Sequence, residues 1–134
     1  MRALIVEDVA VNRELLEALM QRHGECVSVA SGEDAVEAFT EAWEDGRPFD
    51  IVFMDIMLPG MDGLQALETL RDLETQRGIP PQHQVMVIMT TALDDDANAA
   101  RAFFQGRAVS YINKPLTLEK VEGELRNLGL LDQA

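Results

Sequence analysis

Five short, largely apolar runs divide the chain, and polar or turn-forming residues close each of them. The runs cover residues 3–6, 26–29, 51–54, 85–89 and 109–112. Apolar runs of this length between turn signals are typical of strands that are buried on both faces. The pattern therefore predicts five buried strands.

The segments between the runs repeat their apolar residues at the three- and four-residue spacing of amphipathic helices. Ser31 and Thr117 stand where helix N-caps are expected, and Gly24 is expected to end the first helix. Three aspartates, residues 94–96, precede the fourth helix and complement its dipole. The predicted stripes are Val11, Leu15 and Leu19; Val36, Phe39 and Trp43; Leu64, Leu67, Leu70 and Leu73; Ala99, Ala100, Phe103 and Phe104; and Leu118, Val121, Leu125 and Leu128.

Strands and helices alternate strictly along the chain. The predicted fold class is therefore α/β, a doubly wound, five-stranded parallel sheet with helices on both faces. Parallel strands bring their carboxyl ends to one edge, where open α/β folds place their sites. The polar residues that follow strands at this edge are Glu7, Asp8, Asp55, Thr91 and Lys114. We expect these side chains, which are distant in sequence, to lie together.

Asp55 is the candidate nucleophile of this site. It follows the third apolar run directly, and Pro59, Gly60 and Gly63 form a turn into the next helix. The strand would thus deliver one carboxylate to the rim of the sheet. A carboxylate in this position can attack phosphorus and form an aspartyl phosphate.

Three carboxylates at one edge predict a bound cation. Glu7 and Asp8 would lie beside Asp55, and mutual repulsion would raise a carboxyl pKa unless a cation is present. Mg²⁺ prefers oxygen ligands, accepts few carboxylates and neutralises a phosphoryl group in transfer. The sequence therefore predicts a Mg²⁺ site.

The remaining edge residues fit the same chemistry. Lys114 offers a compact positive charge to one phosphoryl oxygen, and Thr91 offers a hydroxyl to another. Ala92 is small enough to leave the pocket open. These residue types are the parts needed to form and hold an aspartyl phosphate.

Composition narrows the classes of partner and compartment. Eleven Lys and Arg stand against 24 Asp and Glu, a net charge of −13, so we expect no direct nucleic-acid contact. No apolar run has membrane-spanning length, and no signal peptide precedes the first strand. The single cysteine, Cys26, cannot form an internal disulfide. These features favour the cytoplasm and no membrane contact.

Together these residues resemble the receiver domain of the bacterial response-regulator family, over nearly the whole chain. The matching residues are Glu7, Asp8, Asp55, Pro59, Gly63, Thr91, Ala92, Tyr111, Lys114 and Pro115. The resemblance implies a flavodoxin-like sheet of strand order 2-1-3-4-5. It implies a receiver domain over residues 1–129 with a short tail over residues 130–134. We expect a stand-alone, chemotaxis-regulator-like protein with no output domain.

The resemblance also implies roles for the edge residues. Asp55 would take a phosphoryl group from a sensor histidine kinase or a phosphotransfer protein, and Lys114 would pair with that group. Asp8 and Asp55 would bind Mg²⁺ directly, together with the main-chain carbonyl of Met57. Glu7 would act through a metal-bound water.

Phosphorylation would then operate a switch. Thr91 would move toward the phosphoryl group and Tyr111 would turn inward, which would reshape the face built from helix four, strand five and helix five. The Lys114–Pro115 peptide would be cis. The chain would control a downstream protein effector or pass the phosphoryl group on, as a monomer or a phosphorylation-linked dimer. Because it would catalyse only its own modification, it would not be an enzyme in the turnover sense.

Some features depart from the family pattern. Gly106 lies eight residues before Lys114, where seven is commoner, which predicts a bulge before strand five. The loop over residues 76–84 is long for the family. Met57 and Leu93 are apolar at positions that tune hydrolysis, which predicts slow self-dephosphorylation.

Two other functions fit the residues less well. An aspartyl-phosphate phosphatase typically needs a second acid two residues after its nucleophile, and Met57 stands there. A non-signalling scaffold would have no need of the intact set Asp8, Asp55, Thr91 and Lys114. The sequence does not decide between a relay and an effector-binding switch.

Overall fold

The computed structural model describes residues 1–92, 97, 100–102 and 105–131. Within these residues five parallel strands form one sheet in the order β2-β1-β3-β4-β5. The strands are β1 (Arg2–Val6), β2 (Glu25–Val29), β3 (Ile51–Asp55), β4 (Met86–Thr91) and β5 (Ser110–Asn113). The predicted fold class and strand order are confirmed.

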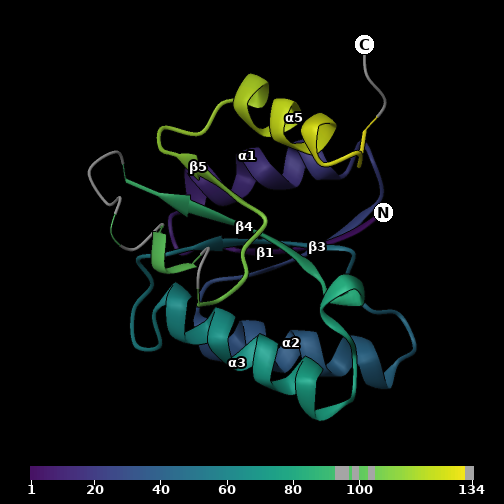
Figure 1. Ribbon diagram of the computed structural model, residues 1–134. Coiled ribbons are helices and arrows are strands. Elements are labelled where there is room, and N and C mark those ends of the chain that lie inside the picture. Colours follow the sequence, from purple (N-terminus) through teal and green to yellow (C-terminus); the bar gives the residue numbers. More distant parts are fainter. Residues whose placement is uncertain (93–96, 98–99, 103–104, 132–134) are drawn as a thin grey trace.

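Helices cover both faces of the sheet (Figure 1). On one face lie α1 (Ala10–Met20) and α5 (Leu118–Asn127), and on the other α2 (Gly32–Glu44) and α3 (Gly63–Gln76). The loop before β4 contains a short 3₁₀ helix, η1 (Pro81–His83). The predicted fourth helix, with aspartates 94–96 at its start, lies mostly outside the described residues. No helix in the described part of the chain combines the length and apolarity needed to cross a membrane.

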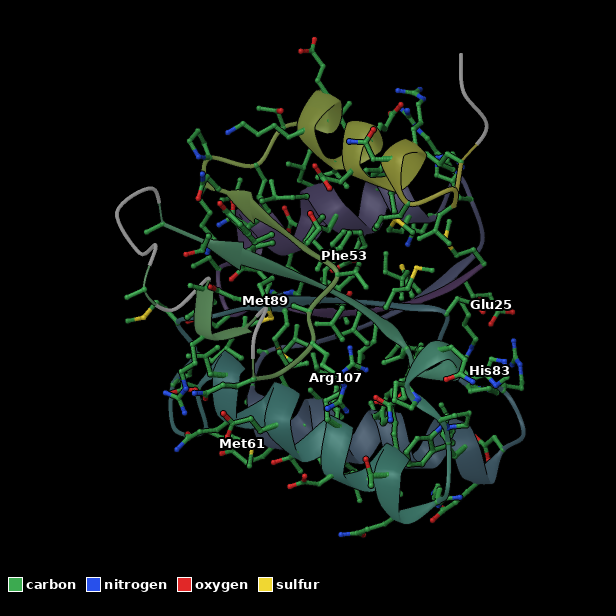
Figure 2. The ribbon with its side chains drawn as sticks, in the orientation of Figure 1. Glu25, Phe53, Met61, His83, Met89 and Arg107 are labelled. Atoms are coloured by element: carbon green, nitrogen blue, oxygen red, sulfur yellow. The ribbon has the colours of Figure 1, made fainter. Side chains whose placement is uncertain are left out.

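In the part of the chain that the structure describes, the core consists of two apolar clusters, one on each face of the sheet. From β3, Val52 and Met54 join the cluster under α2 and α3, whereas Ile51 and Phe53 join the cluster under α1 and α5. Phe53 and Met89, both labelled in Figure 2, belong to opposite clusters. Successive side chains of a strand point to opposite faces, so a strand that is covered twice must be apolar throughout.

The stripe predicted for α1 is partly wrong. Val11 is 69% exposed, whereas the buried residues are Leu16, Leu19 and Met20. All three lie in the second half of α1, so only that half packs closely on the sheet. The helix also ends at Met20, before Gly24. Gly24 is needed instead because a Cβ there would lie 1.8 Å from the carbonyl oxygen of Met1.

The start of β4 differs from the prediction by one residue. The N–H of Val85 donates to Oε2 of Glu74 at 2.7 Å, and its carbonyl accepts from Nη1 of Arg71 at 2.8 Å. Because side chains satisfy these main-chain groups, the ladder begins only at Met86. β5 likewise begins and ends one residue later than its apolar run.

Arg71 and Glu74 form a buried ion pair on α3, with Nη1 and Oε1 2.8 Å apart. Arg71 also donates to the carbonyl oxygens of Gly106 and Arg107, both at 2.9 Å. Arg107 adopts a φ of 56°, the left-handed conformation. The loop for which the sequence predicts a bulge thus contains this unusual backbone, and Arg71 fastens it to α3.

Candidate functional site

Three charged side chains meet at the carboxyl edge of the sheet. Glu7 follows β1, Asp55 ends β3, and Lys114 follows β5. Nζ of Lys114 lies 2.9 Å from Oδ2 of Asp55 and 3.1 Å from Oε1 of Glu7. Asp55 is 3% exposed and Glu7 is 1% exposed. One ammonium group therefore faces two buried carboxylates.

The turn after β3 holds Asp55 tightly. Its Oδ1 accepts a hydrogen bond of 3.1 Å from the N–H of Met57. The N–H of Gly63 donates to the carbonyl of Ile56 at 2.9 Å, and this brings the start of α3 against the strand end. A Cβ on Gly63 would lie 2.0 Å from the carbonyl oxygen of Asp55. Only glycine at position 63 therefore permits this close approach.

Side chains at two helix starts fix the same turn. Asp62 caps α3 and forms a capping box with Gln65, in which each side chain accepts a hydrogen bond from the other residue's N–H. Glu33, in the first turn of α2, accepts from the N–H of Met61 at 3.1 Å. Gly60 has a φ of 69° and lies against the Glu33 carboxylate. The turn is therefore tied to both neighbouring helices.

Glu7 is in an unusual electrostatic setting. Burial, followed by the adjacent carboxylate of Asp55, raises its pKa from 4.5 to about 7, although Lys114 acts in the opposite direction. Its Oε2 accepts from the N–H of Val9 at 3.3 Å. Its Oε1 is buried and pairs with Lys114 by charge, but accepts no hydrogen bond from the described residues. Glu7 therefore takes up a proton at a higher pH than an ordinary glutamate, and one of its two carboxylate oxygens accepts no hydrogen bond from the described residues.

Lys114 is held by its main chain as well as by its charge. Its N–H donates to the carbonyl of Thr91 at 2.7 Å, which ties it to the end of β4. Burial alone would lower the pKa of its ammonium group, but the adjacent carboxylates of Asp55 and Glu7 raise it above the ordinary value. The Lys114–Pro115 peptide is cis, as the resemblance implies.

The acidic residues fit a divalent cation. Glu7, Asp8 and Asp55 can each present one carboxylate oxygen within 4.8 Å of the others. Asp8 is exposed and can reach solvent, whereas the other two are buried. Oε1 of Glu7, which accepts no hydrogen bond from the described residues, adds a hard oxygen to this set. This donor set suits Mg²⁺. The Met57 carbonyl remains a predicted ligand.

The predicted switch residues lie beside this cluster. Thr91, at the end of β4, is 1% exposed, and its hydroxyl donates to the carbonyl of Ala92 at 3.3 Å. Tyr111, on β5, is 38% exposed in this structure. Leu93, predicted to tune hydrolysis, lies outside the described residues. The switch roles stay predictions.

Two cations near the site, Arg13 and Lys120, are not predicted by the sequence pattern. Arg13 donates from Nη1 to the carbonyl of Glu7 at 3.0 Å. Lys120 donates from Nζ to the carbonyls of Asn113 and Pro115. The available signal for Lys120 was its place in the first turn of α5, where the helix dipole disfavours a cation unless it finds other partners.

Two sequence relatives show how this chain compares with longer proteins. It is 35% identical over 117 residues to the sensor protein GacS of Pseudomonas syringae pv. syringae, covering 87% of this chain and 12% of that protein. It is 39% identical over 102 residues to the regulatory protein VanRB of Enterococcus faecalis, covering 73% and 41% respectively. The chain thus spans less than half of the length of these curated relatives.

Two solved structures are similar over almost the whole chain. One shows the receiver domain of the Saccharomyces cerevisiae response regulator Ssk1 with the histidine phosphotransfer protein Ypd1, with 26% identity, a TM-score of 0.80 and coverage of 99% and 93%. The other shows the receiver domain of the Arabidopsis thaliana histidine kinase CKI1 with Mg²⁺ and BeF₃⁻, with 25% identity, a TM-score of 0.78 and coverage of 96% and 89%.

The family model described as the response regulator receiver domain matches residues 3–126, which is most of the chain. The sheet order and the Asp55–Lys114 pair at its carboxyl edge agree with that match. The chain therefore belongs to the response regulator receiver domains, and it is a receiver domain of two-component signalling.

Proposed function

We propose that Asp55 accepts a phosphoryl group from the phosphohistidine of a sensor histidine kinase or a histidine phosphotransfer protein, in a Mg²⁺-dependent reaction. The observation that carries this proposal is the buried Asp55 carboxylate, paired with Lys114 and grouped with Glu7 and Asp8. A buried carboxylate at a strand end, with a cation 2.9 Å away, is poised to take up a charged group.

In this reaction a carboxylate oxygen of Asp55 attacks the phosphorus. The new O–P bond forms as the P–N bond to the donor histidine breaks, and the imidazole nitrogen takes up a proton. Hydrogen bonds to Met57 and Lys114 fix the direction of the carboxylate before attack. Lys114 then offers its ammonium group to an oxygen of the transferred group.

Asp8, Asp55 and the main-chain carbonyl of Met57 would hold Mg²⁺, with Glu7 bound through a water. The ion supplies neutralisation of charge on the phosphoryl oxygens. Of the chain's own residues, Glu7 must give up its proton before it can contribute negative charge. Asp8 is the solvent-exposed carboxylate of the three, so a hydrated ion would contact it before the two buried ones.

The structural neighbours support the donor and the ion. A similar receiver domain crystallised with a histidine phosphotransfer protein, and another with Mg²⁺ and BeF₃⁻. We extend both features to this chain as proposals. We place the reaction in the cytoplasm, the compartment that the single cysteine favours.

The output would be a change of surface and not turnover of a substrate. Thr91 and Tyr111 would respond to the phosphoryl group and alter the surface around β5 and α5, for a protein effector or an onward phosphotransfer partner. The protein would act as a monomer or a phosphorylation-linked dimer. Residues 1–129 would act as the phosphoacceptor unit. Catalysis would be confined to its own modification.

The alternative functions have less support from the site. The Met57 side chain is 66% exposed and apolar, so it supplies no acid or base for a phosphatase. A scaffold has no need of a lysine aimed at two buried carboxylates, which costs desolvation of all three groups. Slow self-dephosphorylation remains our expectation, because Met57 cannot orient a water.

The first test is the intact mass after incubation with acetyl phosphate and Mg²⁺. We expect one added phosphoryl group of about 80 Da that requires Mg²⁺ and is absent in Asp55→Asn. Asp50→Asn, which changes the residue just before the start of β3, should be modified like the wild type. An adduct that persists in Asp55→Asn would show that another residue is the acceptor. Failure of the wild type to take up either a phosphoryl group or beryllofluoride would support the scaffold.

A further inference from the structure

Lys120 forms hydrogen bonds with the main chain on both sides of Lys114. Its Nζ donates to the carbonyl of Asn113 at 3.1 Å and to the carbonyl of Pro115 at 3.0 Å. These carbonyls belong to the residues immediately before and after Lys114. One ammonium group therefore links the start of α5 to the segment from which the Lys114 side chain extends.

The position of Lys120 in α5 calls for such partners. It lies three residues after the N-cap Thr117, whose hydroxyl accepts from the Lys120 N–H at 3.2 Å. A cation in the first turn is opposed by the helix dipole. Among the described residues, Lys120 has no carboxylate within ion-pair distance, so the two carbonyls are its compensation.

We propose that Lys120 is a positioning residue for Lys114, an inference that rests on the proposed phosphorylation of Asp55. The Lys114 N–H is fixed by Thr91 on β4, and Lys120 fixes the carbonyls on either side. Because these hydrogen bonds restrict the main chain before and after Lys114, its side chain can contact Asp55 in a single loop conformation. Less ordering is then required when the phosphoryl group arrives.

The chain permits a direct test because Lys114 and Lys120 are its only lysines. In Lys120→Met with ¹³C-labelled lysine, every lysine signal comes from Lys114. In the metal-free protein we expect the Lys114 Cε signal to move toward that of a solvated lysine and to sharpen. Lys120→Arg, which keeps a donor for the carbonyls, should restore the wild-type signal. A Lys114 signal unchanged in Lys120→Met would overturn the proposal, whether or not Asp55 is phosphorylated.

A second readout concerns the reaction. With acetyl phosphate and Mg²⁺, Lys120→Met should gain its phosphoryl group about three- to tenfold more slowly, with Mg²⁺ affinity unchanged. The ¹⁹F resonances of its beryllofluoride adduct should shift, because Lys114 contacts the bound group. Arg126→Gln, which removes a cation paired with Glu122 elsewhere on α5, is the matched control and should behave like the wild type.

The outcomes separate this inference from the proposed function. If the wild type is not modified, the proposed function fails, while the lysine signals still report on Lys120. If the wild type is modified and Lys120→Met reacts at the same rate with the same ¹⁹F spectrum, the positioning role fails alone. Equal losses of rate, Mg²⁺ affinity and thermal stability in Lys120→Met would indicate a purely structural role and would also overturn it.

Discussion

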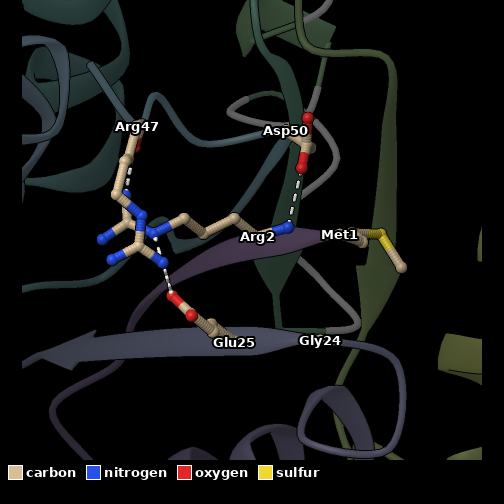
Figure 3. A pocket seen from close by; sticks show the side chains of 6 residues that line it. All are labelled: Met1, Arg2, Gly24, Glu25, Arg47 and Asp50. Carbon is tan, nitrogen blue, oxygen red and sulfur yellow. Dashed lines mark hydrogen bonds and ion pairs between the residues drawn. The ribbon is translucent and has the colours of Figure 1, made fainter.

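Ion pairs lie at both ends of the sheet, but water reaches them very differently. At the amino edge, the Glu25 carboxylate accepts hydrogen bonds from Arg2 and Arg47 (Figure 3). The Glu25 side chain is 62% exposed, and Arg47 followed by Arg2 lowers its pKa. Two cations serve one carboxylate, and solvent screens whatever charge remains.

The carboxyl edge has the opposite balance. There one ammonium group, that of Lys114, serves the two buried carboxylates of Glu7 and Asp55. Burial, followed by the adjacent carboxylate of Asp55, raises the pKa of Glu7, and its Oε1 accepts no hydrogen bond from the described residues. An ion pair alone therefore does not mark a site, whereas a buried pair with uncompensated charge does.

Replacement of Lys114 should have the largest effect on this contrast. Lys114→Met leaves two buried carboxylates without their cation, so we expect a loss of about 3 kcal/mol in the metal-free free energy of unfolding at pH 8. The loss should shrink at pH 5, where Glu7 is protonated. Arg47→Met, at the exposed edge, should leave the urea midpoint within experimental scatter. If both variants lost the same free energy of unfolding, the two edges would not differ in the way described.

Removal of the excess charge should stabilise the metal-free protein. The folded pKa of Glu7, about 7, exceeds the value of 4.5 for an ordinary glutamate, so the folded state holds a proton that the unfolded state releases between these pH values. Wild-type stability therefore falls as pH rises through this window. Glu7→Gln removes the penalty, and we expect a gain of about 2 kcal/mol at pH 8 and little change at pH 4.

Urea denaturation at several pH values, without Mg²⁺, measures this effect. Glu25→Gln is the matched control at the other edge and should show no gain at pH 8, since its carboxylate is solvated and paired. A destabilised Glu7→Gln at pH 8 would mean that the pairing of Glu7 with Lys114 outweighs the cost of its burial.

Mg²⁺ affinity should depend on pH at the carboxyl edge. Because protonated Glu7 cannot contribute its charge, a pKa near 7 predicts about tenfold weaker apparent binding at pH 6 than at pH 8. A calorimetric Mg²⁺ titration at both pH values measures the ratio. Glu7→Gln should bind weakly at both and lose the dependence. A wild-type affinity that is flat across this range would show that Glu7 does not take part.

The sequence predicts the carboxyl edge better than it predicts the details around it. Asp55 and Lys114 are 59 residues apart, yet strand polarity alone requires their strands to end at the same edge. The positions at which the apolar runs end therefore suffice to predict that these charged residues lie together. The sequence pattern does not predict which residues of α1 are buried, because the exposure of Val11 depends on which part of the helix packs on the sheet.

The buried hydrogen bonds of Arg71 could not be predicted from the sequence, for a different reason. Its partners at positions 106 and 107 are main-chain carbonyls, 35 and 36 residues away, and a carbonyl has no residue type that a pattern could detect. An arginine in a polar helix position is normally solvated. The same limit applies to Lys120, whose partners are also carbonyls.

Salt should distinguish the two edges by the smallest of these effects. At about 1 M salt the screening length falls to about 3 Å, so the exposed Arg47 and Arg2 should lose influence on Glu25. The pKa of Glu25 should then rise toward its ordinary value, while that of Glu7, set first by burial, should stay near 7. Carboxyl ¹³C titrations at low and high salt measure both groups in one sample. Because added salt screens solvent-exposed charges far more than buried ones, a Glu7 pKa that moved as far as that of Glu25 would mean that water enters the carboxyl edge, and the uncompensated charge would no longer distinguish it.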